Sequence, residues 1–292
     1  MTNELAALSN DLAAAVERAG KSVVAVHARP RFSSAGVIWQ PGVIVTAEHT
    51  VRREEEITVT LPDGTDRPVT LAGADAGTDI AVLKLAEPAG EPAQARTGEI
   101  RPGYLALAIG RSENSGVNAT LGIISAVSGS WRTWRGGRLD QYIRLDVNMY
   151  PSSSGGAVID TSGAVIGIAT SGLSRIAGLA IPASTINRVT NEILSRGRVA
   201  RGYLGVGLQP VNVTDHQKGL IVLSVEQDGP AGKAGLLVGD ILVALGGKTV
   251  TDTGDVQTAL ESVAVGQAIE AALLRGGAAR QVAITVGERR RD

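Results

Sequence analysis

Short apolar runs, bounded by Gly, Pro, Asp or Ser, recur through the first two thirds of the chain. No long helical pattern separates them, which favours an all-β barrel or a pair of packed sheets over a parallel sheet with crossover helices. Eleven of these runs predict strands: SVVAVHA, AGVIW, GVIVTA, EITVTL, RPVTLAG, DIAVLKL, YLALAIG, LGIISAVSG, QYIRLDV, GAVID and AVIGIAT.

Residues 3–18 carry a different pattern. Leu5, Leu8, Leu12 and Val16 recur every three or four residues, so they would share one face of a helix. We expect an amphipathic surface helix that precedes the first strand.

A second helical pattern, over residues 183–195, ends the region rich in strands. Its apolar positions at helical spacing are Ile186, Val189 and Ile193. Ser184 is expected to cap the start of this helix. The polar stretch 196–201 then predicts a linker, so the first domain is expected to cover residues 1–195.

From residue 202 onward the order of elements changes. GLIVLSV and DILVALGG predict strands and DVQTALESV predicts a helix, while AIEAALLR and RQVAITV predict a last hairpin around GGAA. This order is typical of a small, separate α+β domain, which we expect over residues 202–292.

Composition removes several classes of function. A formal net charge of −1 gives no electrostatic surface for nucleic acid, and no apolar run reaches the ~18 residues of a membrane span, so neither partner is expected. The chain has no cysteine, which excludes thiol nucleophiles and disulfides. With three histidines, no metal site is expected, and no cofactor.

The first 20 residues lack the basic start and the apolar stretch of a secretory signal. As written, the chain is therefore expected in the cytoplasm. A trimmed amino terminus would instead place the protein in the cell envelope or periplasm.

Three residues at the edges of predicted strands could act together in acyl transfer. Taken alone, His49 could be a structural loop histidine, Asp79 a turn cap and Ser154 part of a polar loop. Acyl transfer by serine requires a base, a carboxylate that orients it and N–H donors for the oxyanion. The order His49, Asp79, Ser154 in an all-β chain matches the chymotrypsin-like arrangement.

The segments VTAEHTV, TDIAVLKL and SSSGGAVIDTSGAVIGIAT closely resemble the catalytic segments of the HtrA (Deg) family of trypsin-like serine proteases. RGYLGV and DGPAGKAGLLVGDILVALGGKTV resemble the PDZ domain that follows the protease in that family. The resemblance covers about residues 4–287. It implies a mainly β fold, with two six-stranded Greek-key barrels followed by a small α+β PDZ domain. It also implies that His49 is the general base, Asp79 its orienting carboxylate and Ser154 the nucleophile.

The chain departs from the family pattern just before the predicted nucleophile. The family has Gly-Asn-Ser-Gly-Gly, where this chain has Ser152, Ser153 and Ser154 before two glycines. The resemblance implies an oxyanion hole formed by the N–H groups of Ser152 and Ser154. Serine at position 152 keeps the N–H but narrows the freedom of the peptide to flip. We expect an active enzyme in which the loop before Ser154 favours one orientation of this peptide. Ser153 has no assigned role.

Related proteases suggest the residues around the specificity pocket. Asn148 and Met149 fall at its base, and Thr170, Ser171 and Gly172 fall on the opposite wall and on the strand that pairs with substrate. No acid stands there to receive Lys or Arg. We expect a small or medium apolar side chain before the cleaved bond.

The PDZ resemblance implies a binding site for peptide carboxyl termini. In such domains an extended peptide adds to a sheet edge while its carboxylate meets backbone N–H groups of a loop. The residues that match the loop are Tyr203, Leu204, Gly205 and Val206, and those that would form the facing helix wall are Val256 and Leu260.

The resemblance implies an ATP-independent serine endopeptidase that cleaves unfolded or misfolded proteins and assembles as a homotrimer. A non-catalytic, chaperone-like scaffold that binds peptides and retains the protease fold is the alternative hypothesis.

Overall fold

The computed structural model describes residues 3–112, 116–213 and 218–288. The chain divides into two compact units, Met1–Val199 and Ala200–Asp292. The first unit holds two closed barrels of six antiparallel strands each, and the prediction of a mainly β fold with two such barrels is confirmed.

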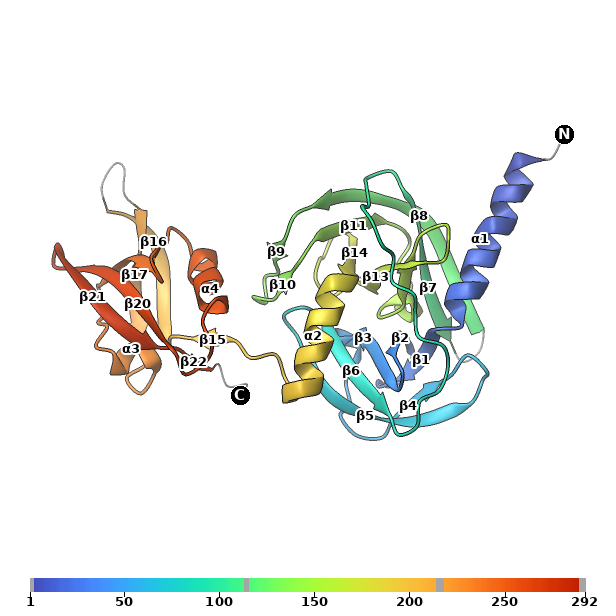
Figure 1. Ribbon diagram of the computed structural model, residues 1–292, viewed down its shortest axis with the longest axis horizontal. Coiled ribbons are helices and arrows are strands. Elements are labelled where there is room, and N and C mark those ends of the chain that lie inside the picture. Colours follow the sequence, from blue (N-terminus) through green and yellow to red (C-terminus); the bar gives the residue numbers. More distant parts are fainter. Residues whose placement is uncertain (1–2, 113–115, 214–217, 289–292) are drawn as a thin grey trace. The chain divides into compact units, whose positions relative to one another are not determined.

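The first barrel, in blue and cyan in Figure 1, is closed by the pairing of its first and fourth strands. Around the barrel the strands are β1 (Val23–His27), β2 (Ser34–Gln40), β3 (Val43–Ala47), β6 (Ile80–Leu85), β5 (Asp66–Asp75) and β4 (Ile57–Thr60). Every residue of β3 is buried, because this strand lies between β2 and β6 with apolar neighbours on both of its faces.

The second barrel follows in green and yellow (Figure 1). Its strands, in order around the barrel, are β11 (Tyr142–Asp146), β14 (Gly178–Pro182), β13 (Val165–Thr170), β12 (Ala157–Ile159), β7 (Leu105–Ser112) and β8 (Gly116–Ser128). Strand β14 was not among the predicted runs. The hairpin of β9 (Trp131–Arg132) and β10 (Arg138–Leu139) was not predicted either, and it extends from the connection between β8 and β11.

Helix α1 (Glu4–Gly20) is longer than the predicted 3–18 and packs with only part of its predicted apolar face. Leu12 and Val16 contact the core, but Leu5 is 77% exposed and Leu8 is 42% exposed. Figure 1 shows the reason: the first half of the helix extends beyond the barrel.

Helix α2 (Ala183–Arg196) packs against strands of both barrels and is buried at the three predicted apolar positions. Two details of the prediction were wrong. The helix starts at Ala183 after Pro182, so Ser184 lies within the first turn and does not cap it. It ends at Arg196, one residue later than predicted, and Gly197 caps it with a left-handed φ of 74° and an N–H that donates to the carbonyl of Ile193.

The described part of the second unit has a six-stranded antiparallel sheet, a separate two-stranded sheet and two helices. Its elements are β15 (Gly202–Tyr203), β16 (Val206–Asn212), β17 (Lys218–Val225), α3 (Pro230–Lys233), β18 (Ile241–Leu245), β19 (Lys248–Thr249), α4 (Thr253–Glu261), β20 (Ala268–Arg275), β21 (Ala278–Thr285) and β22 (Gly287–Glu288). It has its own apolar core, to which Leu220, Leu242 and Ile284 belong. No helix in the described part of the chain combines the length and apolar character needed to span a bilayer.

Candidate active site

His49 lies on a single turn of 3₁₀ helix, η1 (Glu48–Thr50), directly after strand β3. The Thr50 hydroxyl donates to the carbonyl of Ala47 at 2.7 Å, and the N–H of Val51 donates to the carbonyl of Glu48 at 2.9 Å. These two hydrogen bonds fix the turn at the end of a buried strand. The ring is therefore carried by the rigid part of the first barrel.

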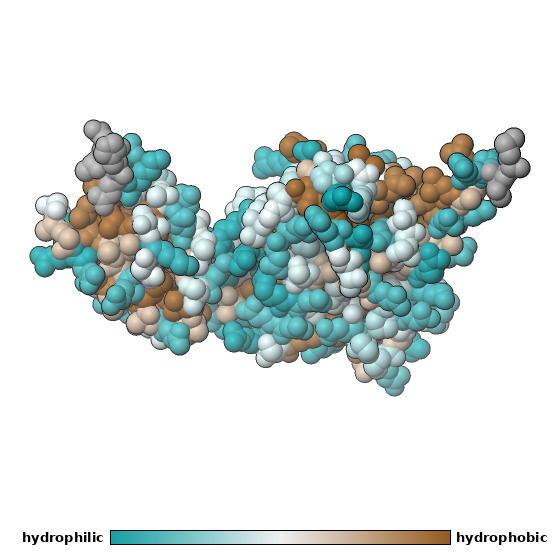
Figure 2. Space-filling view, turned by 45° about the horizontal axis from the view of Figure 1, so that its top comes forward, coloured by the Kyte–Doolittle hydropathy of each residue, from teal (hydrophilic) through white to brown (hydrophobic). Residues whose placement is uncertain are grey.

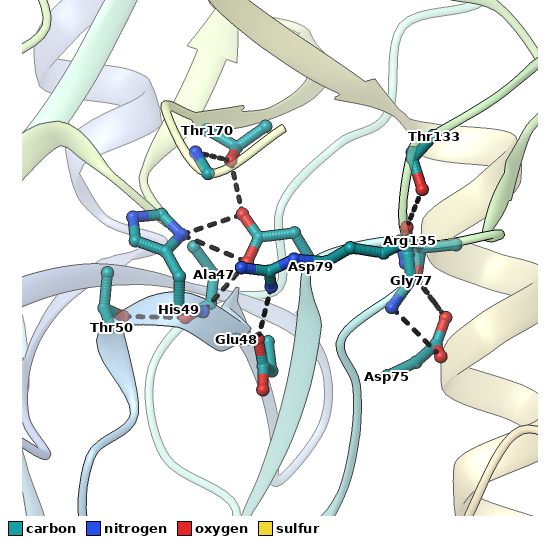
Figure 3. A network of polar contacts seen from close by, with 12 residues as sticks. Ala47, Glu48, His49, Thr50, Asp75, Gly77, Asp79, Thr133, Arg135 and Thr170 are labelled. Carbon is teal, nitrogen blue, oxygen red and sulfur yellow. Dashed lines mark hydrogen bonds and ion pairs between the residues drawn. The ribbon is translucent and has the colours of Figure 1, made fainter. Parts of the chain in front are cut away.

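Asp79 immediately precedes β6 and is fully buried. Its carboxylate accepts hydrogen bonds from the backbone N–H of His49 at 2.8 Å, from the His49 ring and from the hydroxyl of Thr170. An isolated buried carboxylate would be costly, and these donors offset the loss of water. Figure 3 shows the carboxylate between the imidazole and Thr170.

The contact between Asp79 and the imidazole fixes the tautomer of His49. Nδ1 lies 2.8 Å from Oδ2 and 3.0 Å from Oδ1 of Asp79. An ionised carboxylate only accepts hydrogen bonds, so Nδ1 must carry a proton. In the neutral ring Nε2 is then left as the acceptor, which is the state that a general base requires.

Ser154 follows a second 3₁₀ turn, η2 (Pro151–Ser153), and its side chain is largely buried. The carbonyl of Ser154 accepts from Ala35 at 3.0 Å, and the N–H of Gly155 donates to Ala169 at 2.8 Å. Gly155 has a φ of 83°, and a Cβ there would lie 2.3 Å from the carbonyl oxygen of Ala35. The chain can pass this closely beside β2 only because residue 155 is glycine.

The hydroxyl of Ser154 pairs with the hydroxyl of Ser171 at 3.3 Å. Among the residues that the structure describes, no hydrogen bond joins Ser154 to His49. Both barrels contribute to the predicted triad, His49 and Asp79 from the first and Ser154 from the second. In this arrangement the hydroxyl of the predicted nucleophile is hydrogen-bonded to Ser171.

The turn before Ser154 is held from outside by Arg29. This guanidinium donates to the carbonyl of Pro151 at 3.0 Å, and also to Phe32 at 3.1 Å and Ser33 at 3.2 Å. Burial, with Arg52 nearby, lowers the pKa of Arg29 from its usual value. Sequence reasoning missed Arg29, since no motif marks an arginine that bridges two segments 122 residues apart.

Ser152 and Ser153 occupy η2 without backbone strain. Within the described ranges, the residues other than glycine with positive φ are Arg31, Glu56 and Asp79, so Ser152 is not among them. The carbonyl oxygen of Ser152 lies close to Gly110. A Cβ at position 110 would be 2.3 Å from this oxygen. The Ser153 hydroxyl is buried without a hydrogen-bond partner among the described residues. Serine at position 152 thus fits the observed turn.

The residues predicted for the specificity pocket occupy two different settings. Thr170 and Gly172 lie against Asp79 and His49, because Thr170 donates to Asp79 and a Cβ on Gly172 would lie 2.6 Å from His49 Nδ1. Ser171 is exposed beside Ser154. Asn148 is exposed and Met149 is half-buried, close to Gly178. Their part in substrate selection stays a prediction.

In the second unit, the predicted carboxylate-binding loop connects β15 to β16. The Leu204 carbonyl accepts from Ala231 at 2.8 Å, and the Gly205 carbonyl accepts from Glu226 at 2.9 Å. In this loop the hydroxyl of Tyr203 donates to Glu226, and Leu204 is buried. Gly205 has a φ of 75°, and Val206 is the first residue of β16.

Val256 and Leu260 lie on α4 and are 6% and 7% exposed, within the core of the second unit. That core also includes Leu204, with Val206 packed against it, so loop and helix share one apolar cluster. Peptide binding by these residues stays a prediction. Of the other histidines, His27 contacts the Thr60 hydroxyl at 2.8 Å, and His216 lies outside the described residues.

Comparison with family models gives an identity to each unit. Residues 34–168 match the model described as a trypsin-like peptidase domain, and residues 202–286 match a PDZ domain.

Comparison with curated proteins finds relatives named "Probable periplasmic serine endoprotease DegP-like". The one from Brucella suis biovar 1 (strain 1330) is 35% identical over 276 residues, which cover 89% of this chain and 53% of the relative. The one from Halomonas elongata is 33% identical over 273 residues, with 89% and 57% covered. The chain thus spans about half the length of the curated relatives it matches.

Solved structures extend the likeness to both units. The serine endoprotease from Yersinia pestis matches with a TM-score of 0.81 and 32% identity, covering 96% of this chain and 98% of that one. The HtrA-type protease AlgW with a decapeptide matches with a TM-score of 0.82 and 30% identity, covering 96% and 99%. On this sequence and structural evidence, the chain belongs to the HtrA (DegP-like) family of serine proteases, with a trypsin-like peptidase domain followed by a PDZ domain.

Proposed function

We propose that this chain is a serine endopeptidase that cleaves unfolded or misfolded proteins without ATP. The observation that carries the proposal is the contact of the buried Asp79 carboxylate with Nδ1 of His49, beside Gly172, whose neighbour Ser171 is hydrogen-bonded to Ser154. It leaves Nε2 of His49 as the atom that would accept the proton of Ser154 once this hydroxyl leaves Ser171.

The reaction would proceed in two halves. Nε2 of His49 takes the proton from Ser154 as Oγ attacks the carbonyl carbon of the scissile bond. The N–H groups of Ser152 and Ser154 stabilise the oxyanion, and the imidazolium then protonates the leaving amine. Water, activated by the same imidazole, hydrolyses the acyl-enzyme and regenerates the Ser154 hydroxyl. Asp79 stays ionised throughout and holds the ring.

The nucleophile can be tested by substitution. We expect Ser154→Ala to lower kcat/KM on casein or another unfolded protein by more than about 10⁴-fold, since residual catalysis in such sites comes only from binding and the oxyanion donors. Ser153→Ala, which alters a neighbouring hydroxyl with no hydrogen-bond partner among the described residues, is the matched control. A fluorophosphonate should label Ser154 in the folded wild type. Cleavage that persists in Ser154→Ala would exclude this nucleophile.

A catalytically silent, chaperone-like scaffold is the second candidate. The hydrogen bond between Ser154 and Ser171 favours it, because the nucleophile does not contact its base in this arrangement. Folded wild-type protein that binds unfolded casein, but neither cuts it nor reacts with the fluorophosphonate, would establish the scaffold instead.

We also propose finer properties of the same site. A small or medium apolar side chain would precede the cleaved bond, beside Met149, and mass spectrometry of the digested casein would map it. The PDZ domain would capture peptide carboxyl termini at the loop of residues 203–206. A place in the cell envelope or periplasm is supported by relatives that are named periplasmic.

A further inference from the structure

The hairpin of β9 and β10 lies on the loop that leads to Asp79. A Cβ on Gly137, in the hairpin turn, would lie 2.1 Å from the carbonyl carbon of Gly77. The two backbones are thus in direct contact, although 60 residues separate them along the chain. Figure 3 shows Thr133 directed toward Gly77.

Thr133 provides the polar part of this contact. Its hydroxyl is buried, donates to the carbonyl of Gly77 at 2.7 Å and accepts from the N–H of Gly137 at 3.2 Å. One side chain therefore closes its own hairpin turn and holds the neighbouring loop. A buried hydroxyl with a donor and an acceptor in place is well defined in its orientation.

The loop from Asp75 to Asp79 is also braced from within. The Asp75 carboxylate accepts from the N–H of Thr78 at 3.1 Å and from its hydroxyl at 2.7 Å. The chain then enters Asp79 with a φ of 60°, which is a costly region for a residue other than glycine. Such a conformation persists only where its surroundings fix it, and Thr133 supplies one of these constraints on Gly77.

The same hairpin also reaches the turn of the general base. Arg135 lies 3.4 Å from the carboxylate of Glu48, and the N–H of Glu48 donates to the carbonyl of Asp79 at 3.1 Å. Both side chains of this ion pair are partly exposed, so the pair contributes little by itself. The buried hydrogen bond of Thr133 is the stronger of the two links.

We infer that Thr133 is a positioning residue for the catalytic triad, acting through Gly77 on the backbone that presents the Asp79 carboxylate to His49. The inference rests on the proposed function. Thr133 makes no contact with the reacting atoms, so its loss should alter the chemical step and leave substrate binding unchanged.

Kinetics of matched variants test this role. We expect Thr133→Val to lower kcat about three- to tenfold, the value of one buried neutral hydrogen bond, with KM for an unfolded substrate within twofold of wild type. Thr133→Ser keeps the hydroxyl and should restore kcat. Thr190→Val is the control, because Thr190 is also buried in the first unit but its hydroxyl has no hydrogen-bond partner in the described part of the chain.

Several results would overturn the inference. These are wild-type kcat in folded Thr133→Val, a rise in KM equal to the fall in kcat, no rescue by Thr133→Ser, or an equal loss in Thr190→Val. If Thr133→Val is unfolded by circular dichroism, Gly137→Ala replaces it, since its Cβ would displace Gly77. The same loss of kcat at constant KM is then expected, and wild-type kcat in the folded variant would overturn the role. An inactive wild type, or an active Ser154→Ala, would instead refute the proposed function.

Discussion

Gly172 shows how little space surrounds the proposed catalytic residues His49 and Asp79. A Cβ at this position would lie 2.6 Å from Nδ1 of His49 and 2.8 Å from Oδ2 of Asp79, inside the hydrogen bond that orients the ring. The N–H of Gly172 also donates to the hydroxyl of Thr170, which itself donates to Asp79. Residue 172 therefore belongs to the support of the triad as well as to the predicted substrate strand.

We expect Gly172→Ala to lower kcat/KM about 100-fold or more, because displacements near 1 Å between reacting groups have effects of that size. Gly129→Ala is the matched control, since a Cβ there would meet no atom within 4 Å. Kinetics on the same substrate, with circular dichroism to confirm folding, measures both. Equal activity of the two variants would show that the imidazole can shift without loss.

Individual residues were predictable from sequence to different degrees. His49 and Asp79 were expected to pair from chain order and family segments, and the structure joins their side chains. The pairing of Ser154 with Ser171 was not foreseeable, because a side-chain orientation depends on contacts between distant segments. The hydrogen bonds from Thr170 to Asp79 and from Arg29 to Pro151 were not predicted, for the same reason.

At the scale of elements, the pair of Asp240 and Arg275 links two strands of the second unit. Asp240, just before β18, accepts from Nε of Arg275 at 2.8 Å and from the N–H of Leu237 at 2.8 Å, and Arg275 ends β20. The hydrogen bond from Arg275 is the main reason that the pKa of Asp240 is lowered. Its contribution to stability is thus present above the unfolded pKa of about 4 and is lost as the pH falls through the lower, folded value.

We expect Asp240→Asn to destabilise the second unit by about 1 kcal/mol at pH 7, a small value because Arg275 is partly exposed. The difference from wild type should start to shrink below about pH 4, where the unfolded wild-type chain takes up a proton, and should disappear below the lower pKa of the folded Asp240. Amide hydrogen exchange in β17, β18 and β20 of the full chain measures it. A difference that stays constant down to pH 2 would contradict this linkage.

The missed elements share a physical cause. The segment of β14 starts with glycine and ends with proline, both of which are disfavoured in isolated strand patterns. It forms a strand because β11 and β13 pair with it on either side. Strands β9 and β10 have two residues each, too few for a pattern of alternation. Long apolar runs such as β6 were predicted because their apolar residues mark a buried strand in the sequence itself.

At the scale of the whole molecule, several large apolar side chains of the first unit are exposed. Leu5 and Leu8 on α1 are exposed, as are Leu121 and Ile123 on β8. Figure 2 shows apolar surface gathered beside the amino-terminal helix. Contiguous apolar surface of this kind is typical of protein interfaces.

We expect a homotrimer with a mass of three times the 30.0 kDa of the chain. Sedimentation equilibrium over a range of concentrations measures it, and dilution should shift the distribution toward the single chain only at low concentration. A lone species near 30.0 kDa at every concentration would contradict the trimer.

The division of the proposed catalytic residues between two barrels would link activity to the integrity of the fold. His49 and Asp79 belong to one barrel and Ser154 to the other, and residues of both barrels share one buried apolar cluster. A copy that opens between the barrels would therefore separate these three residues in the same step that exposes this core. A protease of unfolded chains with this arrangement would lose its own activity when it unfolds. A damaged copy would become a substrate of intact copies and would no longer cleave other chains.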